Sequence, residues 1–299
     1  MSAPATTAAP GSASLLLPIV FVPLWSSGFA LARLVAPHAD PLTFLAVRFA
    51  LALLALTAIA LWKGAAWPRS AREWRQAFFA GFLIHGLYLG GVFWSVANGL
   101  PTAISALMAG MQPLLVMLLA GRLLGERISR RGAIGILVGA LGTLVTLAPK
   151  LGATDAGGIP FVPLLVCLAG VLAITVGSIF VKRTAISADP LTNTAAQYIG
   201  ALVPTALVMP FVGGPAFDTS AVPLWIGLAW SVFGMSIGAI LLLMHMIRAG
   251  ALSKVSSLFF LVPGVSALMA WVGFGESLTL MQVAGLSIAT LGVSLASRG

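Results

Sequence analysis

The chain has 299 residues, of which 60% are hydrophobic and only 8% are charged. A soluble domain is about 45–50% apolar and about 25% charged, so this composition excludes a soluble globular fold, a disordered chain and a coiled coil. A mean hydropathy of +1.07 and long apolar runs without alternation favour a helical membrane protein over an outer-membrane barrel. The net charge of +9 could suggest a nucleic-acid partner. In a membrane protein, however, basic residues are first interpreted as topology signals, so we expect no nucleic-acid partner.

Residues 1–14 carry no charge, and we expect a short disordered tail rather than a secretory signal, which needs a basic start. Beyond this tail, ten segments are apolar over the length of about 20 residues that a membrane helix needs. These segments are residues 15–35, 41–62, 76–98, 102–124, 131–149, 160–181, 190–212, 223–247, 253–274 and 278–297. The predicted fold class is therefore an all-α integral membrane protein with ten transmembrane helices.

Basic residues between these segments predict the orientation of the chain. If the N-terminus is cytoplasmic, 13 Lys and Arg residues lie in inside loops and 2 lie outside. Cytoplasmic loops carry such an excess of positive charge. We therefore expect a multi-pass protein of the bacterial cytoplasmic (inner) membrane with both termini in the cytoplasm.

The second half of the chain repeats the first. At an offset of 150 residues, six positions agree: Pro113, Gly125, Glu126, Gly135, Leu141 and Gly142 recur as Pro263, Gly275, Glu276, Gly285, Leu291 and Gly292. At an offset of 149, the turn Asp40-Pro41-Leu42-Thr43 recurs as Asp189-Pro190-Leu191-Thr192. The repeats are predicted over residues 15–150 and 151–299. Each repeat contains five helices, and because five is odd, the second repeat enters the membrane from the opposite side. The repeats are therefore inverted, an arrangement typical of secondary transporters.

Together with the start Trp25-Ser26-Ser27-Gly28-Phe29 and the Gly125-Glu126 pair, this order of motifs resembles the EamA-type exporters of the drug/metabolite transporter superfamily. The resemblance covers about residues 15–297. Within the family, the chain looks most like the YddG-type exporters of aromatic and other amino acids. It implies a basket-like fold in which the first, third and fourth spans of each half line a central cavity. Gln197 stands where Arg48 would be matched, so any role of that arginine is not symmetric.

A cavity for amphipathic metabolites needs aromatic faces, hydroxyl and amide groups, and adaptable Met side chains. The chain offers such a mixture on the spans that the resemblance places at the cavity. The candidate substrate-binding residues are Trp25, Ser26, Ser27, His85, Tyr88, Trp94, Met108, Gln112, Ser178, Phe233, Ser236, Met244, His245, Phe259 and Phe260. For any one of these aromatic or Met residues, lipid contact or helix packing is the competing interpretation.

Three ionisable side chains, Arg48, His85 and His245, lie inside apolar spans, where such groups are costly and often functional. Either histidine could contact substrate, carry a proton, or be a hydrogen-bonded packing residue. Arg48 lies seven residues after Pro41, so it could also snorkel to the interface or pair with an acid at the outer rim.

Prolines and acidic residues complete the predicted site. Pro113 and Pro263 each remove a backbone hydrogen bond within a span, and we interpret them as paired gating bends or as static bends that shape packing. All seven acidic residues lie in turns or at span ends, which disfavours a proton or sodium relay. Glu126 and Glu276 are expected to stabilise the starts of the helices that Ser129 and Thr279 cap.

The leading functional prediction is export of amino acids and related small metabolites by alternating access, either as uncoupled facilitated diffusion or by proton exchange. The alternatives are a multidrug or nucleotide-precursor carrier, a channel, or a membrane-embedded enzyme. We expect no enzyme activity, cofactor or metal, because the three histidines are scattered and Cys167 is the only cysteine. The expected partners are a small-molecule substrate and the lipid bilayer. The oligomeric state is left open, and a monomer is compatible with the sequence.

Overall fold

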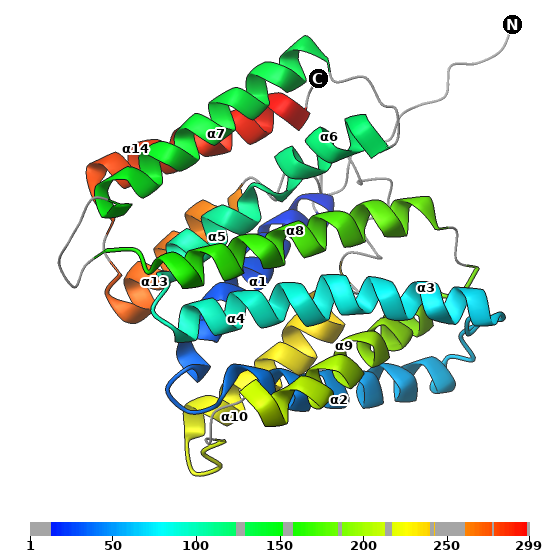
Figure 1. Cartoon of the computed structure of the whole chain (residues 1–299). Helices are drawn as coiled ribbons and strands as arrows, with labels where there is room; N and C mark the ends of the chain where they lie inside the picture. The colour runs from blue at the N-terminus through cyan, green and yellow to red at the C-terminus, as the bar shows by residue number, and fades with distance from the viewer. Residues whose placement is uncertain are drawn as a thin grey trace, which may run out of the picture.

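The computed structural model describes residues 13–123, 129–151, 158–184, 187–212, 217–239, 242, 261–276 and 278–297. Over these residues the protein is helical without any strand, and its helices lie side by side (Figure 1). Most of the predicted disordered tail, residues 1–12, lies outside the described residues. The all-α membrane fold predicted from the sequence is confirmed, whereas the exact division near residue 150 stays a prediction.

The first half of the chain contributes five spans, two of which are interrupted. The helices are α1 (Ala13–Val35), α2 (Pro41–Trp62), α3 (Ala71–Gly81) continuing through the π-helical segment η1 (Phe82–Leu87) into α4 (Tyr88–Ala97), α5 (Thr102–Gly110) with α6 (Gln112–Leu123), and α7 (Arg130–Leu151). The second half contributes α8 (Phe161–Arg183), α9 (Pro190–Val212), α10 (Val222–Ala229) with the π-helical segment η2 (Trp230–Gly238), α13 (Val262–Phe274) and α14 (Leu280–Ser297).

Length and surface composition suit these helices to a bilayer. Among the described residues, five helices are long and apolar enough to cross a membrane, and four shorter apolar helices accompany them. Large apolar side chains remain exposed on their outer faces; Leu54 is 65% exposed, Leu137 71% and Phe211 88%. Such exposure would be unfavourable in water, but it suits contact with lipid tails.

The repeated Asp-Pro turn has the same structural role in both halves. Asp40 accepts hydrogen bonds from the backbone N–H and the hydroxyl of Thr43, at 2.9 and 3.1 Å, and so caps α2. Asp189 accepts a bond of 2.8 Å from the backbone N–H of Leu191 at the start of α9. A carboxylate before a proline at the first helical position is a favourable helix start, which explains why both second spans begin at the predicted residue.

Contacts between loops fall into two groups, as an inverted repeat requires. At one end, the backbone N–H of Asp218 donates to the carbonyl of His38 at 2.8 Å, and Thr102 donates to the Glu276 carboxylate. At the other end, Ser187 donates to the Glu73 carboxylate, and the backbone N–H of Asp189 donates to the carbonyl of Ala66. Each contact joins one half of the chain to the other on the same face of the membrane.

Glu276 departs from the role that its sequence position predicted. Thr279 does cap α14, in a reciprocal pair with Gln282, and Ser129 accepts from the backbone N–H of Gly132 at the start of α7. The Glu276 carboxylate, however, accepts from the backbone N–H and the hydroxyl of Thr102, at 3.0 and 2.9 Å. It therefore satisfies the N-terminus of α5 in the other repeat, where the helix dipole favours a negative charge. Glu126 lies outside the described residues.

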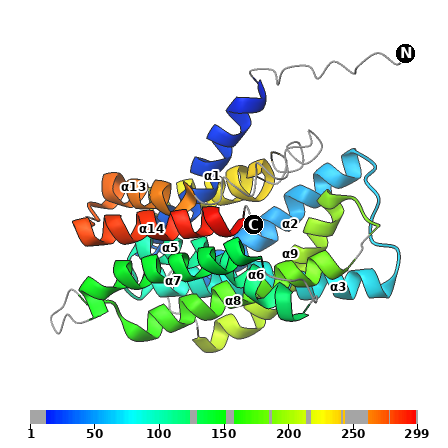
Figure 2. The same cartoon turned by 90° about the horizontal axis from the view of Figure 1, so that it is seen from above.

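The two fifth spans meet through small residues. Helices α7 and α14 lie side by side along one edge of the bundle (Figure 1, Figure 2). A Cβ added at Gly142 would overlap the backbone of Ala289, and one added at Gly292 would overlap the backbone of Gly139. These two contacts are equivalent under the repeat, and they allow the close approach on which helix association in lipid depends.

The first span of each half packs against the third span of the other half. A Cβ at Gly28 in α1 would lie 2.6 Å from Cε of Met235 in η2, and a Cβ at Gly177 in α8 would lie 2.7 Å from Cγ1 of Ile84 in η1. Gly28 and Gly177 are equivalent residues of the repeat. The halves are therefore interlocked rather than merely adjacent, and the space enclosed between them is bounded by both.

We expect Gly142→Leu and Gly292→Leu each to lower the melting temperature of the purified protein by more than about 5 °C, because overpacking a tight contact costs about 1–3 kcal/mol. Gly273→Leu is the matched control, since no atom of the described residues lies within 4 Å of a Cβ there. Thermal unfolding in detergent measures the effect. Equal losses in the control and in the two seam variants would contradict close packing of α7 on α14.

Candidate functional site

A cavity of about 240 Å³ lies between the two halves of the chain. Its walls come from α1, α2, η1 and α4 of the first half and from α8, α9 and η2 of the second. It is lined by Trp25, Gly28, Phe29, Arg48, Ile84, His85, Tyr88, Leu89, Val92, Phe93, Ile174, Thr194, Gln197, Tyr198, Met235 and Ala239. Ligand pockets span about 300–1,000 Å³, so a cavity just below that range suits a small substrate.

Polar groups gather where α2, η1 and α9 meet. The Arg48 side chain is only 3% exposed, and the hydroxyl of Tyr198 is a hydrogen-bonding neighbour of its guanidinium. The His85 ring stacks on the Tyr198 ring with centroids 4.7 Å apart, and Gln197 is a hydrogen-bonding neighbour of His85. One end of the cavity therefore carries a cation, an imidazole, an amide and a phenol.

Tyr198 is itself held in place by a second layer of hydrogen bonds. Its hydroxyl donates to Oγ of Ser236 at 2.7 Å, and that Oγ donates to the carbonyl of Ser231 at 2.9 Å. The acceptor lies five residues before the donor inside η2, where the wider π-helical turn changes the spacing of side chains and carbonyls. The π-helical segment thus positions a wall residue of the cavity from behind.

Apart from Thr194, the rest of the cavity lining is mostly aromatic and aliphatic. Trp25 and Phe29 come from α1, and Tyr88 and Phe93 from α4. The Phe93 ring is stacked on Phe44, with centroids 5.7 Å apart, which fixes its position. A ligand in this space would meet aromatic and aliphatic faces along most of its length and hydrogen-bonding groups at one end.

Three of the candidate residues, Trp25, His85 and Tyr88, line this cavity. Ser236 lies behind the wall, where it accepts from Tyr198. Gln112 lines a smaller adjoining pocket of about 20 Å³, which shares Trp25 and Tyr88 with the main cavity. These positions are compatible with substrate contact.

Gln112 and Ser178 are joined to each other. Nε2 of Gln112 donates to Oγ of Ser178 at 3.0 Å, and that Oγ donates to the carbonyl of Ile174 at 2.7 Å. Ile174 lines the main cavity. The pair therefore connects the interruption between α5 and α6 with α8, at the edge of the cavity.

Ser26 and Ser27 connect helices instead of lining the cavity. Ser26 Oγ donates to the carbonyl of Val262 at 3.3 Å, and Ser266 Oγ donates to the Ser26 carbonyl at 3.2 Å, which joins α1 to α13. Ser27 Oγ accepts from Nε1 of Trp230 at 2.8 Å, which joins α1 to η2. Both serines satisfy polar groups within the bundle, as the absence of water requires.

The remaining candidates lie away from the lining or outside the described residues. Met108 is buried in the core, Trp94 is partly buried on α4, and Phe233 is 67% exposed on η2. Neither Trp94, Met108 nor Phe233 is among the residues that line the described cavity. Met244, His245, Phe259 and Phe260 lie outside the described residues.

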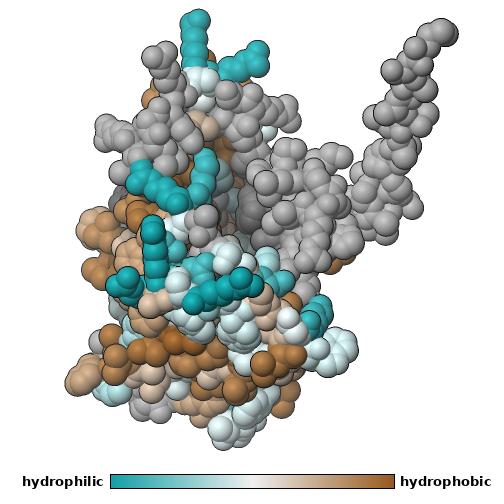
Figure 3. Space-filling view, turned by 90° about the vertical axis from the view of Figure 1, so that its right-hand side faces the viewer, coloured by the Kyte–Doolittle hydropathy of each residue, from teal (hydrophilic) through white to brown (hydrophobic). Residues whose placement is uncertain are grey.

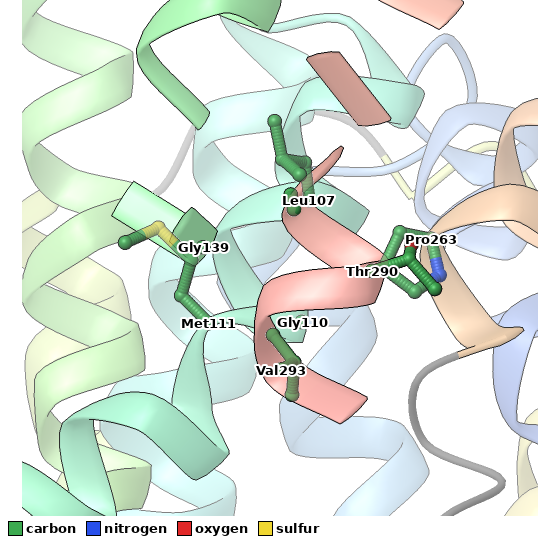
Figure 4. A pocket seen from close by; sticks show the side chains of 8 residues that line it. Leu107, Gly110, Met111, Gly139, Pro263, Thr290 and Val293 are labelled. Atoms are coloured by element: carbon green, nitrogen blue, oxygen red, sulfur yellow. The ribbon is translucent and has the colours of Figure 1, made fainter. Parts of the chain in front are cut away.

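Pro113 and Pro263 lie where their spans change direction or begin. Pro113 follows the break at Met111 between α5 and α6 and lines the pocket of about 20 Å³. Pro263 lies at the start of α13, with its ring against Gly110 of α5. Figure 4 shows Pro263 beside Gly110 and Thr290 in a third pocket of about 10 Å³, which has room for one water at most. Whether either proline gates the cavity stays a prediction.

Sequence reasoning missed Thr194, Gln197 and Tyr198 as wall residues, and for Arg48 it left open a functional role within the span, snorkelling to the interface, or an ion pair at the outer rim. Its guanidinium neither snorkels nor reaches the outer rim; it is buried against α9. The offset of 149 carried the missing signal. Arg48 and Gln197 are equivalent positions, and both line the cavity, while the equivalent rings of Phe49 and Tyr198 lie 5.8 Å apart.

Inverted repeats that enclose a cavity of mixed polarity within the membrane define the class of secondary transporters. The EamA-like transporter family matches residues 12–148 and again residues 162–298. The chain therefore belongs to the EamA-like transporter family of the drug/metabolite transporter superfamily. It is a multi-pass membrane transporter.

Relatives span most of the chain. An uncharacterized transporter of Bacillus subtilis, YvbV, is 25% identical and covers 96% of this chain and 92% of its own. A chloroplastic WAT1-related protein of Arabidopsis thaliana is 25% identical over 94% of this chain and 68% of its own. A solved structure with a TM-score of 0.64 and 23% identity covers 95% of this chain and 96% of that one, and it shows the same fold.

Labelling of an introduced cysteine can test whether the cavity is hydrated. The natural Cys167 is buried, so the unmodified protein should react slowly with a charged methanethiosulfonate reagent in detergent. Thr194→Cys on the cavity wall should be modified at least about tenfold faster than Thr192→Cys, whose parent residue is fully buried on the same helix. Mass spectrometry measures both rates. Similar rates would contradict a water-accessible cavity at α9.

Proposed function

We propose that this transporter exports amino acids, aromatic and others, and related small metabolites by alternating access. The observation that carries the proposal is the cavity between the two inverted halves, because its walls come from both and combine aromatic surface with a polar end. A zwitterion with an apolar side chain needs this combination. Trp25 and Tyr88 offer aromatic faces, and Arg48 and Gln197 offer hydrogen-bond donors.

The inverted repeat supports a physical route to alternating access. Two similar halves have two packings of similar energy, so exchanging their conformations opens the cavity to one side or the other. The break before Pro113 and the π-helical segments η1 and η2 interrupt regular helix beside the cavity. Bending is easiest at such interruptions, and we assign the gating role to Pro113 and Pro263.

The charge pattern favours facilitated diffusion of compact, weakly charged substrates. Among the described residues that line the cavity, Arg48 is the one Lys or Arg, and there is no carboxylate. A phosphorylated substrate would need several such cations, and a proton relay would ordinarily use a buried Asp or Glu. The multidrug or nucleotide-precursor alternative is therefore less well supported. The relatives' names point to transport rather than catalysis.

The membrane orientation is also part of the proposal. Six exposed basic residues lie on the face that carries the start of α3 and the ends of α2 and α8, where hydrophilic side chains gather in Figure 3. They are Lys63, Arg69, Arg72, Arg75, Lys182 and Arg183. Because basic loops remain in the cytoplasm, we assign this face to the cytoplasm of a bacterial cell and place both termini there.

Reconstituted proteoliposomes should take up radiolabelled L-phenylalanine in a saturable manner without an imposed pH gradient. Counterflow should accelerate the uptake, which distinguishes a carrier from a channel. Other amino acids should compete, whereas nucleosides and sugar phosphates should compete at least about tenfold more weakly. Absence of uptake, or stronger competition by sugar phosphates, would overturn the amino acid assignment. Uptake that depends wholly on a pH gradient would overturn the uncoupled version.

Fusions of a reporter to each terminus test the orientation. Green fluorescent protein, which fluoresces only in the cytoplasm, should be bright at both ends, and alkaline phosphatase should be inactive at both, because the basic loops hold this face inside. Fusions after Gly99 in the loop before α5 should give the opposite result and serve as the control. Termini on opposite sides of the membrane would exclude an even number of spans.

A further inference from the structure

We propose that Arg48 is the anchor for the substrate's carboxylate, and that this carboxylate, more than any amino group, decides what the cavity binds. The inference rests on the proposed function, since it assigns a substrate class to the same cavity. It goes further by predicting that apolar carboxylates without an amino group are also ligands. The starting observation is a buried cation with hydrogen-bonding capacity to spare.

Arg48 lies within the apolar span Pro41–Trp62 and is 3% exposed, yet its Nε and Nη1 atoms have no hydrogen-bond partner among the described residues. A guanidinium carries five N–H donors, and buried donors are almost always satisfied. Arg48 also lines the cavity. The unsatisfied donors thus belong to a side chain of the cavity wall. Both atoms are covered in this structure, so a bound carboxylate would accept from them after the guanidinium turns toward the cavity.

Within the part of the chain that the structure describes, the surroundings of Arg48 supply no counter-charge. His85, Gln197 and Tyr198 are its polar neighbours on the described cavity wall, and none is an acid. The Tyr198 hydroxyl donates its proton to Ser236. An intramembrane cation without an anionic partner is unfavourable, so a ligand that brings one negative charge would gain more from this site than a neutral one.

The equivalent residue of the second repeat, Gln197, is uncharged, which explains why the proposed anchor is one guanidinium rather than a symmetric pair. Arg48 and Gln197 occupy matching positions and line the same cavity, but only Arg48 is charged. One guanidinium matches one carboxylate, whereas a phosphate dianion requires more positive charge. A substrate would therefore bind in one orientation, with its carboxylate toward α2 and its apolar body against Trp25 and Tyr88.

An ammonium group finds no matching acid on the described part of this wall. Hydroxyl and amide oxygens can accept from it, but without the gain of a charge pair. Removing the ammonium from the substrate should therefore matter less than removing the carboxylate. This ordering separates the proposal from general recognition of zwitterions.

The test compares 3-phenylpropionate with 3-phenylpropanamide, which has the same shape without the charge. Isothermal titration calorimetry on the full chain in lipid nanodiscs should show at least about tenfold tighter binding of the carboxylate, a difference of about 1.4 kcal/mol. Arg48→Gln, which makes this position match residue 197, should remove the difference by weakening carboxylate binding alone. Arg33→Gln, at an exposed site on α1, should leave the difference intact.

If Arg48→Gln does not fold, Arg48→Lys and the two ligands on the natural chain still decide the question. Arg48→Lys should keep a preference for the carboxylate, because the charge remains. Equal binding of acid and amide by the natural chain, binding of neither ligand, or an unchanged preference in Arg48→Gln would overturn the anchor.

The outcomes also separate this inference from the proposed function. If Arg48-dependent binding of 3-phenylpropionate occurs without uptake of L-phenylalanine, the result contradicts amino acid export and supports Arg48 as the carboxylate anchor. If L-phenylalanine is taken up but L-phenylalaninamide competes as well as unlabelled L-phenylalanine, the result supports amino acid export and contradicts Arg48 as the carboxylate anchor. Competition by 3-phenylpropionate within about threefold of L-phenylalanine would support the minor role of the ammonium.

Discussion

Inside a bilayer every backbone N–H and C=O must find its partner within the protein, and this constraint shapes each part of the molecule. Most of the exposed apolar side chains lie on regular helix, and a few, such as Phe233, lie on the outer side of the π-helical segments. The break between α5 and α6 and the segments η1 and η2 all adjoin space between the two halves. A binding cavity can form there because these are the places where the backbone can depart from a regular helix.

The same constraint divides the bundle into parts with different freedom. At its edge, α7 and α14 touch backbone to backbone through glycine and alanine. Such contacts leave little room for one helix to slide along the other, so we expect α7 and α14 to keep a fixed position relative to each other. Around the cavity some contacts are made by longer side chains, such as Met235 against Gly28 and Ile84 against Gly177, although Gly81 also approaches the backbone of Gln197 closely. Long side chains can repack when helices tilt, and the mobile part of a transporter has to allow such repacking.

Much of the fold could be predicted from sequence, because apolar length, basic loops and repeat offsets are linear properties of the chain. The starts of α2 and α9 follow from the Asp-Pro turns alone. The cavity wall was harder to predict, because it depends on which face of a helix turns inward. Trp25, His85 and Tyr88 were found by residue type on the first and third spans. Tyr198 was not, because the resemblance implied that the second span of each half lies away from the cavity, whereas α2 and α9 both contribute to its wall. The position of Arg48 stayed open in the sequence, because distance along a span does not reveal whether a neighbouring helix covers the side chain.

One feature of the third spans bears on the origin of the molecule. The segment η1 covers residues 82–87, and the repeat maps it onto residues 231–236, inside η2. A π-helical turn accommodates one more residue than an α-helical turn, so each half carries the same local widening at the same place. Two independent insertions at equivalent sites are a less economical explanation than a single one in a common ancestor. The widened turn would then be older than the gene duplication, and it would have been present when the ancestral protein was a five-helix unit that formed its passage by pairing with a second, oppositely inserted copy.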